Sequence, residues 1–439
     1  MNSNMQAARR RKAAFASFIG TAIEWYDFYV FSVAAALVFG PVFFPTSDPI
    51  AGLAASFATY AVGFVARPLG AMIFGSIGDR LGRRQALVAT LVLMGLATCL
   101  TGLLPSYDAV GPLAPILLVA LRVIQGIAVG GEWGGAALMA VEHAPENAKS
   151  FYGGFVQLGN PAGAMLATGI FAVLASFGDD ALQSWGWRIP FLISAVLIII
   201  GLVIRARVEE SPVFEPAPAN ARPVRDAIVQ NWRPLLLAIG IMAVPSGSYY
   251  ITSTYFTSYA TVDAGIDATL VLNVLTIGSF VELVATLPAA WLADRFGRIR
   301  VLVIGMVGLG VFGALTFLVV SLNLGGPGLL ILVFALLRLA GCSAYAPLAG
   351  AMAQMFPPQS RYTSISLGYQ VGAAIFGGFS PLAATLLVGA TGSVWAVVAL
   401  LGALVTVAVF CTLRAPQHVD VVVGAGQADP VVAAEVPRV

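Results

Sequence analysis

Two short stretches of the chain decide its architecture, because one repeats the other. Residues 79–88 read DRLGRRQALV, and residues 294–303 read DRFGRIRVLV. The second stretch begins 215 residues after the first and matches it at six of ten positions. In a chain of 439 residues, a recurrence at this distance indicates two copies of one large unit.

The composition around these stretches is that of a membrane protein. Residues of the AVILMFWYC set make up 59% of the chain, charged residues only 10%, and the mean hydropathy is +0.89. Soluble domains carry about 25% charged residues. Long apolar runs such as 191–204 have the length scale of helices that cross a bilayer. We therefore expect an all-α polytopic membrane protein. A net charge of +2 without a basic face argues against nucleic-acid binding.

Clusters of charge, proline and glycine divide the chain into candidate membrane spans. We expect twelve, over residues 15–40, 50–76, 85–104, 112–141, 151–177, 188–206, 234–260, 267–292, 300–321, 328–353, 362–388 and 393–413. With the repeat, they predict a first six-helix half at 1–206 and a second at 233–413. Residues 207–232 are expected to be a cytoplasmic linker, and residues 414–439 a disordered cytoplasmic tail.

The distribution of basic residues predicts the orientation of the chain. Nineteen of the 23 Lys and Arg residues fall in the tails and loops of one side. Since cytoplasmic loops are enriched in these residues, both termini are expected to be cytoplasmic.

Several motifs carry a resemblance to a known family. The loop at 75–84 (GSIGDRLGRR), together with the two parallel repeats, resembles the major facilitator superfamily. The segments IEWYDF at 23–28, ARPLG at 66–70 and SWGWRIPF at 184–191 are similar to the metabolite:proton symporters within it. The fourth span and residues 355–371 look closest to shikimate transporters, whose relatives carry α-ketoglutarate, citrate, proline and betaine. The resemblance implies a major facilitator fold and proton-coupled transport by alternating access.

Charged residues inside the expected spans are the candidates for function, because each costs about 2.5–3.5 kcal/mol at a helix centre. Asp27 and Glu24 are three residues apart, so we expect them to share a helix face and to keep a proton within reach. The resemblance implies that Arg122 faces them and tunes the coupling; the alternative is a static ion pair. The seven charges are Glu24, Asp27, Arg67, Arg122, Glu132, Glu282 and Arg338.

A second set of residues is expected to bind the solute. Guanidinium groups match carboxylates, so Arg67 and Arg338 are candidates for contact with an organic acid. The alternatives are an internal pair of Arg338 with Glu282 and a structural pair for Arg67. Tyrosine hydroxyls and amides could hold a hydroxylated solute or join helices. These further candidates are Tyr250, Tyr255, Gln157, Asn160 and Gln370.

The repeated loops predict a cytoplasmic gate. In the resembled family, such loops latch the two halves together on the cytoplasmic side; the alternative is that their charges only set topology. The gate candidates are Asp79, Arg80, Arg83, Arg84, Glu142, Asp294, Arg295 and Arg298.

Taken together, the sequence predicts a bacterial inner-membrane carrier that imports a small organic anion, shikimate-like or another carboxylic acid, with protons. Import of a zwitterion such as proline or betaine is the main alternative, and a drug/proton antiporter is a weaker one. An enzyme is disfavoured, since the sequence offers neither a nucleophile with its base nor a metal-ligand spacing. We expect no cofactor and no metal, a monomer, and the lipid bilayer, protons and the solute as partners.

Overall fold

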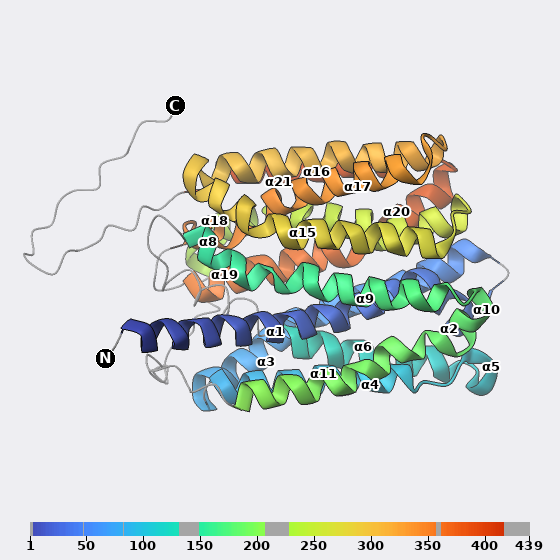
Figure 1. The fold of residues 1–439 in the computed structure, drawn as a ribbon, viewed down its shortest axis with the longest axis horizontal. Helices are drawn as coiled ribbons and strands as arrows, with labels where there is room; N and C mark the ends of the chain where they lie inside the picture. The colour runs from blue at the N-terminus through green and yellow to red at the C-terminus, as the bar shows by residue number, and fades with distance from the viewer. Residues whose placement is uncertain are drawn as a thin grey trace, which may run out of the picture.

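The computed structural model describes residues 3–46, 48–81, 83–130, 149–206, 228–356 and 361–416. Its first half consists of long helices that run along one axis of the molecule and of short helical segments that connect them (Figure 1). They are α1 (Ser3–Leu37), α2 (Phe39–Phe43), α3 (Pro49–Leu81), α4 (Arg83–Gly102), α5 (Tyr107–Val110), α6 (Leu113–Val129), α8 (Lys149–Gln157), α9 (Gly159–Ala175), α10 (Asp179–Ala181), η2 (Leu182–Gly186) and α11 (Arg188–Ala206).

The second half repeats this plan with more interruptions. Its elements are α13 (Trp232–Ile241), η3 (Ala243–Ser248), η4 (Ile251–Tyr255), α14 (Phe256–Ser258), η5 (Tyr259–Asp263), α15 (Ala268–Phe296), α16 (Arg298–Ser321), α17 (Gly326–Tyr345), α18 (Leu348–Ala353), α19 (Arg361–Gly372), η6 (Ala373–Gly378), α20 (Phe379–Thr391) and α21 (Trp395–Arg414).

The predicted all-α membrane fold is confirmed. Among the described residues, nine helical stretches are long and apolar enough to cross a membrane. Two shorter apolar helices, Val88–Gly102 and Leu113–Val129, and α1 correspond to the remaining predicted spans. Helix α1 begins well before the predicted start of the first span, because the polar segment preceding the apolar run is helical too. The predicted linker and tail fall mainly on 207–227 and 417–439, which lie outside the described residues.

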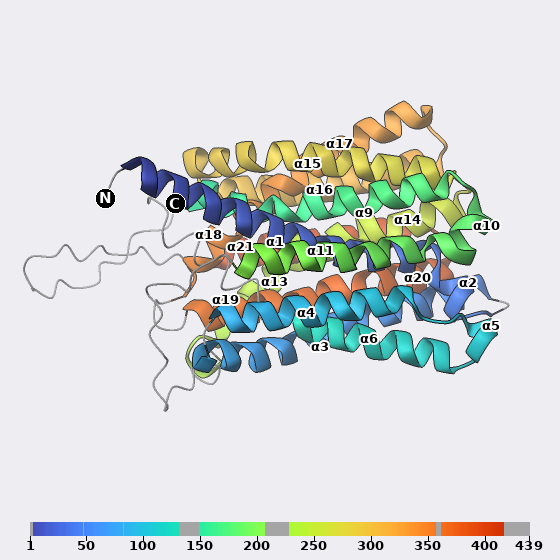
Figure 2. The ribbon, with the colours of Figure 1, turned by 60° about the horizontal axis from the view of Figure 1, so that its bottom comes forward.

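The long helices lie along a common axis, and the connections between them lie at the two ends of the bundle. The start of α1 and the α15–α16 connection lie at one end, and α2, α5 and α10 lie at the other (Figures 1 and 2). In Figure 1 the first half lies below and the second half above. Helix α9 packs along α15, and α3 packs against η6 and α20, so these helices form the boundary between the halves.

Two spans of the second half are partly π-helical at this boundary. Segments η3 and η4 interrupt the seventh span, and η6 interrupts the eleventh. A π turn adds one residue to a helical turn and occurs often at functional sites. A Cβ on Gly377 would lie 3.0 Å from the Tyr250 ring, and one on Gly378 would lie 2.8 Å from Phe64 of the first half. The absence of a side chain at these glycines therefore allows η6 to approach both neighbours.

Helices α3 and α6 pack in direct backbone contact. A Cβ on Gly70 would lie 1.9 Å from the carbonyl oxygen of Ile127, and one on Gly126 would lie 2.1 Å from that of Gly63. Such stripes of small residues let membrane helices pack closely where no hydrophobic effect drives their association. Gly130, just after the last residue of α6, makes the same kind of approach, since a Cβ there would lie 1.9 Å from the carbonyl oxygen of Arg67.

We expect Gly70→Ala to destabilise the protein by about 1–3 kcal/mol, because the added methyl group must push two backbones apart. The control is Gly402→Ala on α21, where a Cβ meets nothing within 4 Å. The thermal unfolding of both variants in detergent checks this. Equal melting temperatures for the two variants would contradict the close packing of α3 and α6.

Candidate functional site

Asp27 is a fully buried carboxylate in α1, with 0% of its surface exposed. Its Oδ1 accepts a hydrogen bond of 2.5 Å from the Ser194 hydroxyl of α11. Its Oδ2 has no hydrogen-bond partner in the described part of the chain. The Thr98 side chain of α4 lies beside the carboxyl group. A carboxylate buried without a cation is costly, and a bound proton removes that cost.

Glu24 lies in different surroundings from Asp27. It lines a small pocket together with Arg67 of α3 and Gln370 of α19. Asp27 does not line this pocket, so the two carboxyl groups have different neighbours. Positions three apart on a helix differ by about 60° in direction, which is enough to turn Asp27 toward α4 and α11.

Arg122 is buried in α6 and does not contact Asp27 directly. Its Nη1 donates to Gln125 Oε1, and Gln125 Nε2 donates to Thr98, the neighbour of Asp27. Arg122 therefore reaches the surroundings of Asp27 through two uncharged side chains. Its guanidinium carbon lies 4.0 Å from the centre of the Phe31 ring, a cation–π distance. Its Nε has no hydrogen-bond partner within the described ranges.

The structure contains the ion pair of Arg338 with Glu282, which the sequence offered as an alternative to solute contact by Arg338. Arg338 Nη1 of α17 lies 3.5 Å from Glu282 Oε2 of α15, and each residue is 3% exposed. The Tyr249 hydroxyl donates to Glu282 Oε2 at 3.4 Å and lies 2.8 Å from the Tyr29 hydroxyl of α1. The Tyr29 hydroxyl also lies 3.1 Å from Asn160 Oδ1 of α9, so its single proton has two alternative acceptors, Tyr249 and Asn160. A buried polar network therefore links the ion pair to the first half.

The sequence contained a signal for this arrangement that our sequence analysis missed. Gly63 and Gly278 are 215 residues apart, the spacing of the repeat, and each faces an arginine of its own half. A Cβ on Gly63 would lie 2.3 Å from Arg122 Nε, and one on Gly278 would lie 3.1 Å from Arg338 Cγ. Glycines at these positions make room for buried guanidinium groups in both halves.

The same spacing relates Arg67 to Glu282. In the second half, the acid Glu282 therefore lies near Arg338. In the first half, the position equivalent to Glu282 holds a second arginine, Arg67. The Arg67 guanidinium lies over the rings of Phe64, at 4.2 Å, and Phe28, at 4.9 Å. Arg67 lines the same pocket as Glu24, so the first half gathers two buried guanidinium groups near the boundary.

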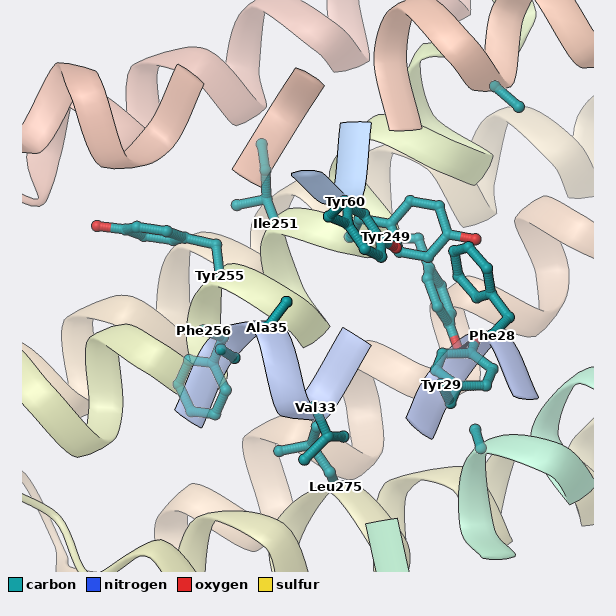
Figure 3. Packing of buried hydrophobic residues seen from close by; sticks show 14 of the residues in the cluster. Phe28, Tyr29, Val33, Ala35, Tyr60, Tyr249, Ile251, Tyr255, Phe256 and Leu275 are labelled. Atoms are coloured by element: carbon teal, nitrogen blue, oxygen red, sulfur yellow. Dashed lines mark hydrogen bonds between the residues drawn. The ribbon is translucent and has the colours of Figure 1, made fainter. Parts of the chain in front are cut away.

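The two tyrosines chosen from the seventh span lie in different places. Tyr250 packs in an aromatic cluster at the boundary between the halves, against Phe28, Tyr60 and Phe64. Tyr255 lies apart from this cluster (Figure 3) and stacks on Tyr259 and Phe317 within the second half. The structure does not bring Tyr255 to the other solute-binding candidates.

The three amide residues predicted to bind the solute also lie in different places. Gln370 Nε2 donates to the carbonyl oxygen of Gly130, at 3.1 Å, and so joins α19 to the end of α6. Its Oε1 has no hydrogen-bond partner among the described residues. Asn160 belongs to the tyrosine network, whereas Gln157 is buried at the end of α8.

Two gate candidates, Asp294 and Arg298, join the two halves. Asp294, at the end of α15, accepts hydrogen bonds from the backbone N–H groups of Ser150 (3.0 Å) and Phe151 (2.9 Å) in the first turn of α8. A carboxylate is favourable there because the N–H groups of a first turn lack helical partners. Arg298 pairs with Asp294 at 3.3 Å and donates to the Ser150 hydroxyl.

Arg295 makes no such contact among the described residues. Arg295 is exposed and lies over the rings of Trp291 and Phe296 on its own helix. Glu142 and the side chains of the first-copy candidates lie outside the described residues, these being Asp79, Arg80, Arg83 and Arg84.

A helical bundle of membrane spans with buried acids and arginines near the boundary of two halves is typical of a membrane transporter. The family model described as "Sugar (and other) transporter" matches residues 12–223, and the model described as "Major Facilitator Superfamily" matches residues 246–436. The chain belongs to the major facilitator superfamily.

Curated relatives extend over most of the chain. The shikimate transporter of Escherichia coli K12 is 41% identical, over 90% of this chain and 92% of its own length. The inner membrane metabolite transport protein YhjE of the same strain is 40% identical, over 86% and 88%. The proline/betaine transporter of the same strain is 34% identical, over 86% of this chain and 77% of its own length. The predicted resemblance is confirmed: the chain is a membrane transporter, not an enzyme.

The fold also matches solved structures. The D-xylose-proton symporter superposes with a TM-score of 0.74 at 17% identity, over 93% of this chain and 98% of its own. A partially occluded inward-open form of the xylose transporter XylE from E. coli gives a TM-score of 0.71 at 17% identity, over 95% and 99%. At this identity the match concerns the fold alone.

Proposed function

We propose that this protein imports a hydroxylated organic acid of the shikimate type together with protons, by alternating access. The observation that carries the proposal is the presence of three buried arginines, Arg67, Arg122 and Arg338, on helices near the boundary of the halves. Buried guanidinium groups need anionic partners, and a carboxylate solute supplies one. Identity to the shikimate transporter over most of the chain supports this class of solute.

Asp27 is the proposed proton carrier. Its carboxyl group is buried, has one free oxygen among the described residues, and is linked to Arg122 only through Thr98 and Gln125. A proton on Asp27 neutralises a carboxylate that is buried without a cation, and a solute carboxylate near Arg67 and Arg122 offsets part of their positive charge. When either is missing, a buried charge remains uncompensated and opposes the conformational change.

The halves touch toward both ends, which supports an alternating-access cycle. Asp294 binds the start of α8 near one end, and the hydroxyls of Ser32 and Thr254 lie 2.6 Å apart farther along the boundary. We assign the Asp294 contact to the cytoplasmic side, as the distribution of basic residues predicts. Opening inward then requires Asp294 to leave the first turn of α8.

We expect Asp294→Asn to favour the inward-open state, because the neutral amide interacts less strongly with the N–H groups of α8 and loses the ion pair with Arg298. A single cysteine placed on either side of this contact should react faster with a water-soluble thiol reagent in the variant. Arg295→Gln is the matched control, since Arg295 contacts only its own helix in the described structure. Equal labelling rates for Asp294→Asn and the parent protein would argue against the gate.

A second candidate function is import of a zwitterion such as proline or betaine. The aromatic cluster of Phe28, Tyr60, Phe64 and Tyr250 supports it, because aromatic rings bind quaternary ammonium groups. In this structure, however, the guanidinium of Arg67 already lies over two of these rings. The proline/betaine transporter also matches a smaller share of its own length than the shikimate transporter does.

Uptake into proteoliposomes with an imposed proton gradient tests the proposal. The solutes are shikimate, hydroxybenzoates, α-ketoglutarate, citrate, proline and betaine, each radiolabelled. We expect gradient-driven accumulation of shikimate or a hydroxybenzoate, abolished by a protonophore. Accumulation of proline or betaine, with no accumulation of shikimate or a hydroxybenzoate, would favour the second candidate. Gradient-driven efflux would favour an antiporter.

A further inference from the structure

The buried pair of Glu282 and Arg338 is more widely spaced than a well-made ion pair. Ion pairs with good hydrogen bonds have N–O distances of about 2.7–2.9 Å. Here the distance from Arg338 Nη1 to Glu282 Oε2 is 3.5 Å, and the Tyr249 hydroxyl reaches the same oxygen only at 3.4 Å. Arg338 Nε has no hydrogen-bond partner in the described part of the chain. The pair is therefore loosely made, and Arg338 retains an unused donor.

The surroundings of Glu282 contain no second cation among the described residues. Arg338 and Cys342 approach it from α17, Tyr249 from the seventh span, and Tyr29 from α1. Thr286 of the same helix donates to the Glu282 backbone carbonyl. If Arg338 turns to another anion, Glu282 has no other positive partner in reach, and a buried unpaired carboxylate is strongly unfavourable.

The position of the pair places it where a solute would meet it. The Tyr29 and Tyr249 hydroxyls join the two halves directly beside Glu282. Separation of the halves must break this contact, which uncovers the pair from the side of the first half. The Arg338 guanidinium also packs on the Tyr249 ring, 4.5 Å from its centre, so its position depends on the same tyrosine.

We propose that Glu282 is a second proton-binding site, which takes up a proton when the carboxylate of the solute replaces it on Arg338. This inference rests on the proposed function and adds to it a residue and a proton. Before exchange, the site holds one guanidinium cation and one carboxylate anion. After exchange, it holds the guanidinium, the solute carboxylate and a neutral Glu282. The solute brings one negative charge and the proton one positive charge, so the net charge stays at zero.

Titration calorimetry tests this inference with shikimate as the probe. The purified protein is titrated in buffers of different ionisation enthalpy, and the dependence of the measured heat on the buffer gives the number of protons taken up on binding. The measurement is made in an Asp27→Asn background, which removes the first proton site. We expect this variant, and the same variant with Glu282→Asp, to take up about one proton per shikimate at a pH where Glu282 is ionised. Addition of Glu282→Gln should reduce the uptake to zero.

Infrared difference spectroscopy gives a second readout that requires no change at Glu282. In the Asp27→Asn protein, shikimate should produce a new band from a protonated carboxyl group. Absence of this band, or equal proton uptake with and without Glu282→Gln, overturns the inference. Failure of the proposed function is distinct: the unmodified protein would show no uptake of shikimate driven by a proton gradient.

Discussion

We expect Asp27→Asn to lower uphill uptake of the solute strongly but to leave exchange of labelled for unlabelled solute across the membrane intact. Asparagine keeps the shape of the side chain and still accepts the hydrogen bond from Ser194. It cannot gain or lose a proton, so each transport cycle loses one coupled proton. If one coupled proton is lost, the accumulation supported by a gradient of one pH unit falls about tenfold.

The measurement compares accumulation with counterflow in the same proteoliposomes. Asp180→Asn is the matched control, because Asp180 is an exposed carboxylate at the end of the bundle where α10 lies. It should accumulate solute as the unmodified protein does. Uphill uptake unchanged in Asp27→Asn would exclude Asp27 as a coupling residue.

Arg338→Gln has the largest expected effect on both stability and transport. The substitution leaves Glu282 buried without its counter-charge, which costs about 3–5 kcal/mol. It also removes the guanidinium proposed to hold the solute carboxylate. We expect a strongly lowered melting temperature in detergent and loss of solute binding.

The double variant Arg338→Gln/Glu282→Gln separates the two effects. Removal of both charges relieves the unpaired acid, so most of the lost stability should return. Binding of the acid should stay absent, because no guanidinium has been restored. Recovery of both stability and binding would show that Arg338 is only a partner for Glu282.

The sequence predicted the fold well because membrane spans leave a strong local signal. About 20 apolar residues in succession identify a spanning helix without knowledge of its neighbours. The repeat at 79–88 and 294–303 predicted two six-helix halves. The pairing of Arg338 with Glu282 was also available as an alternative, since buried charges seek opposite charges.

The partners of individual groups could not be predicted in this way. Ser194 lies 167 residues from Asp27, and no periodic pattern relates a single serine in the sixth span to one acid in the first. The separation of Glu24 from Asp27 depends on how α1 is rotated about its axis. That rotation is decided by the packing of α1 against its neighbours, among them α9, α11 and α3, and the spacing of the two acids does not reveal it. Roles in coupling and binding stay predictions for the experiments above.

The wide turns of η3 and η4 provide a way to break the contact of Tyr249 with the first half without moving the whole half. Tyr249 and Tyr250 lie between these two segments, where the helix carries extra residues in its turns. If one wide turn moved past Tyr249, its side chain would rotate by about 100° around the helix axis. That rotation would carry its hydroxyl away from Tyr29 and Glu282 together. A change of helical register at one tyrosine could thus disconnect the ion pair from the first half before either half moves as a body.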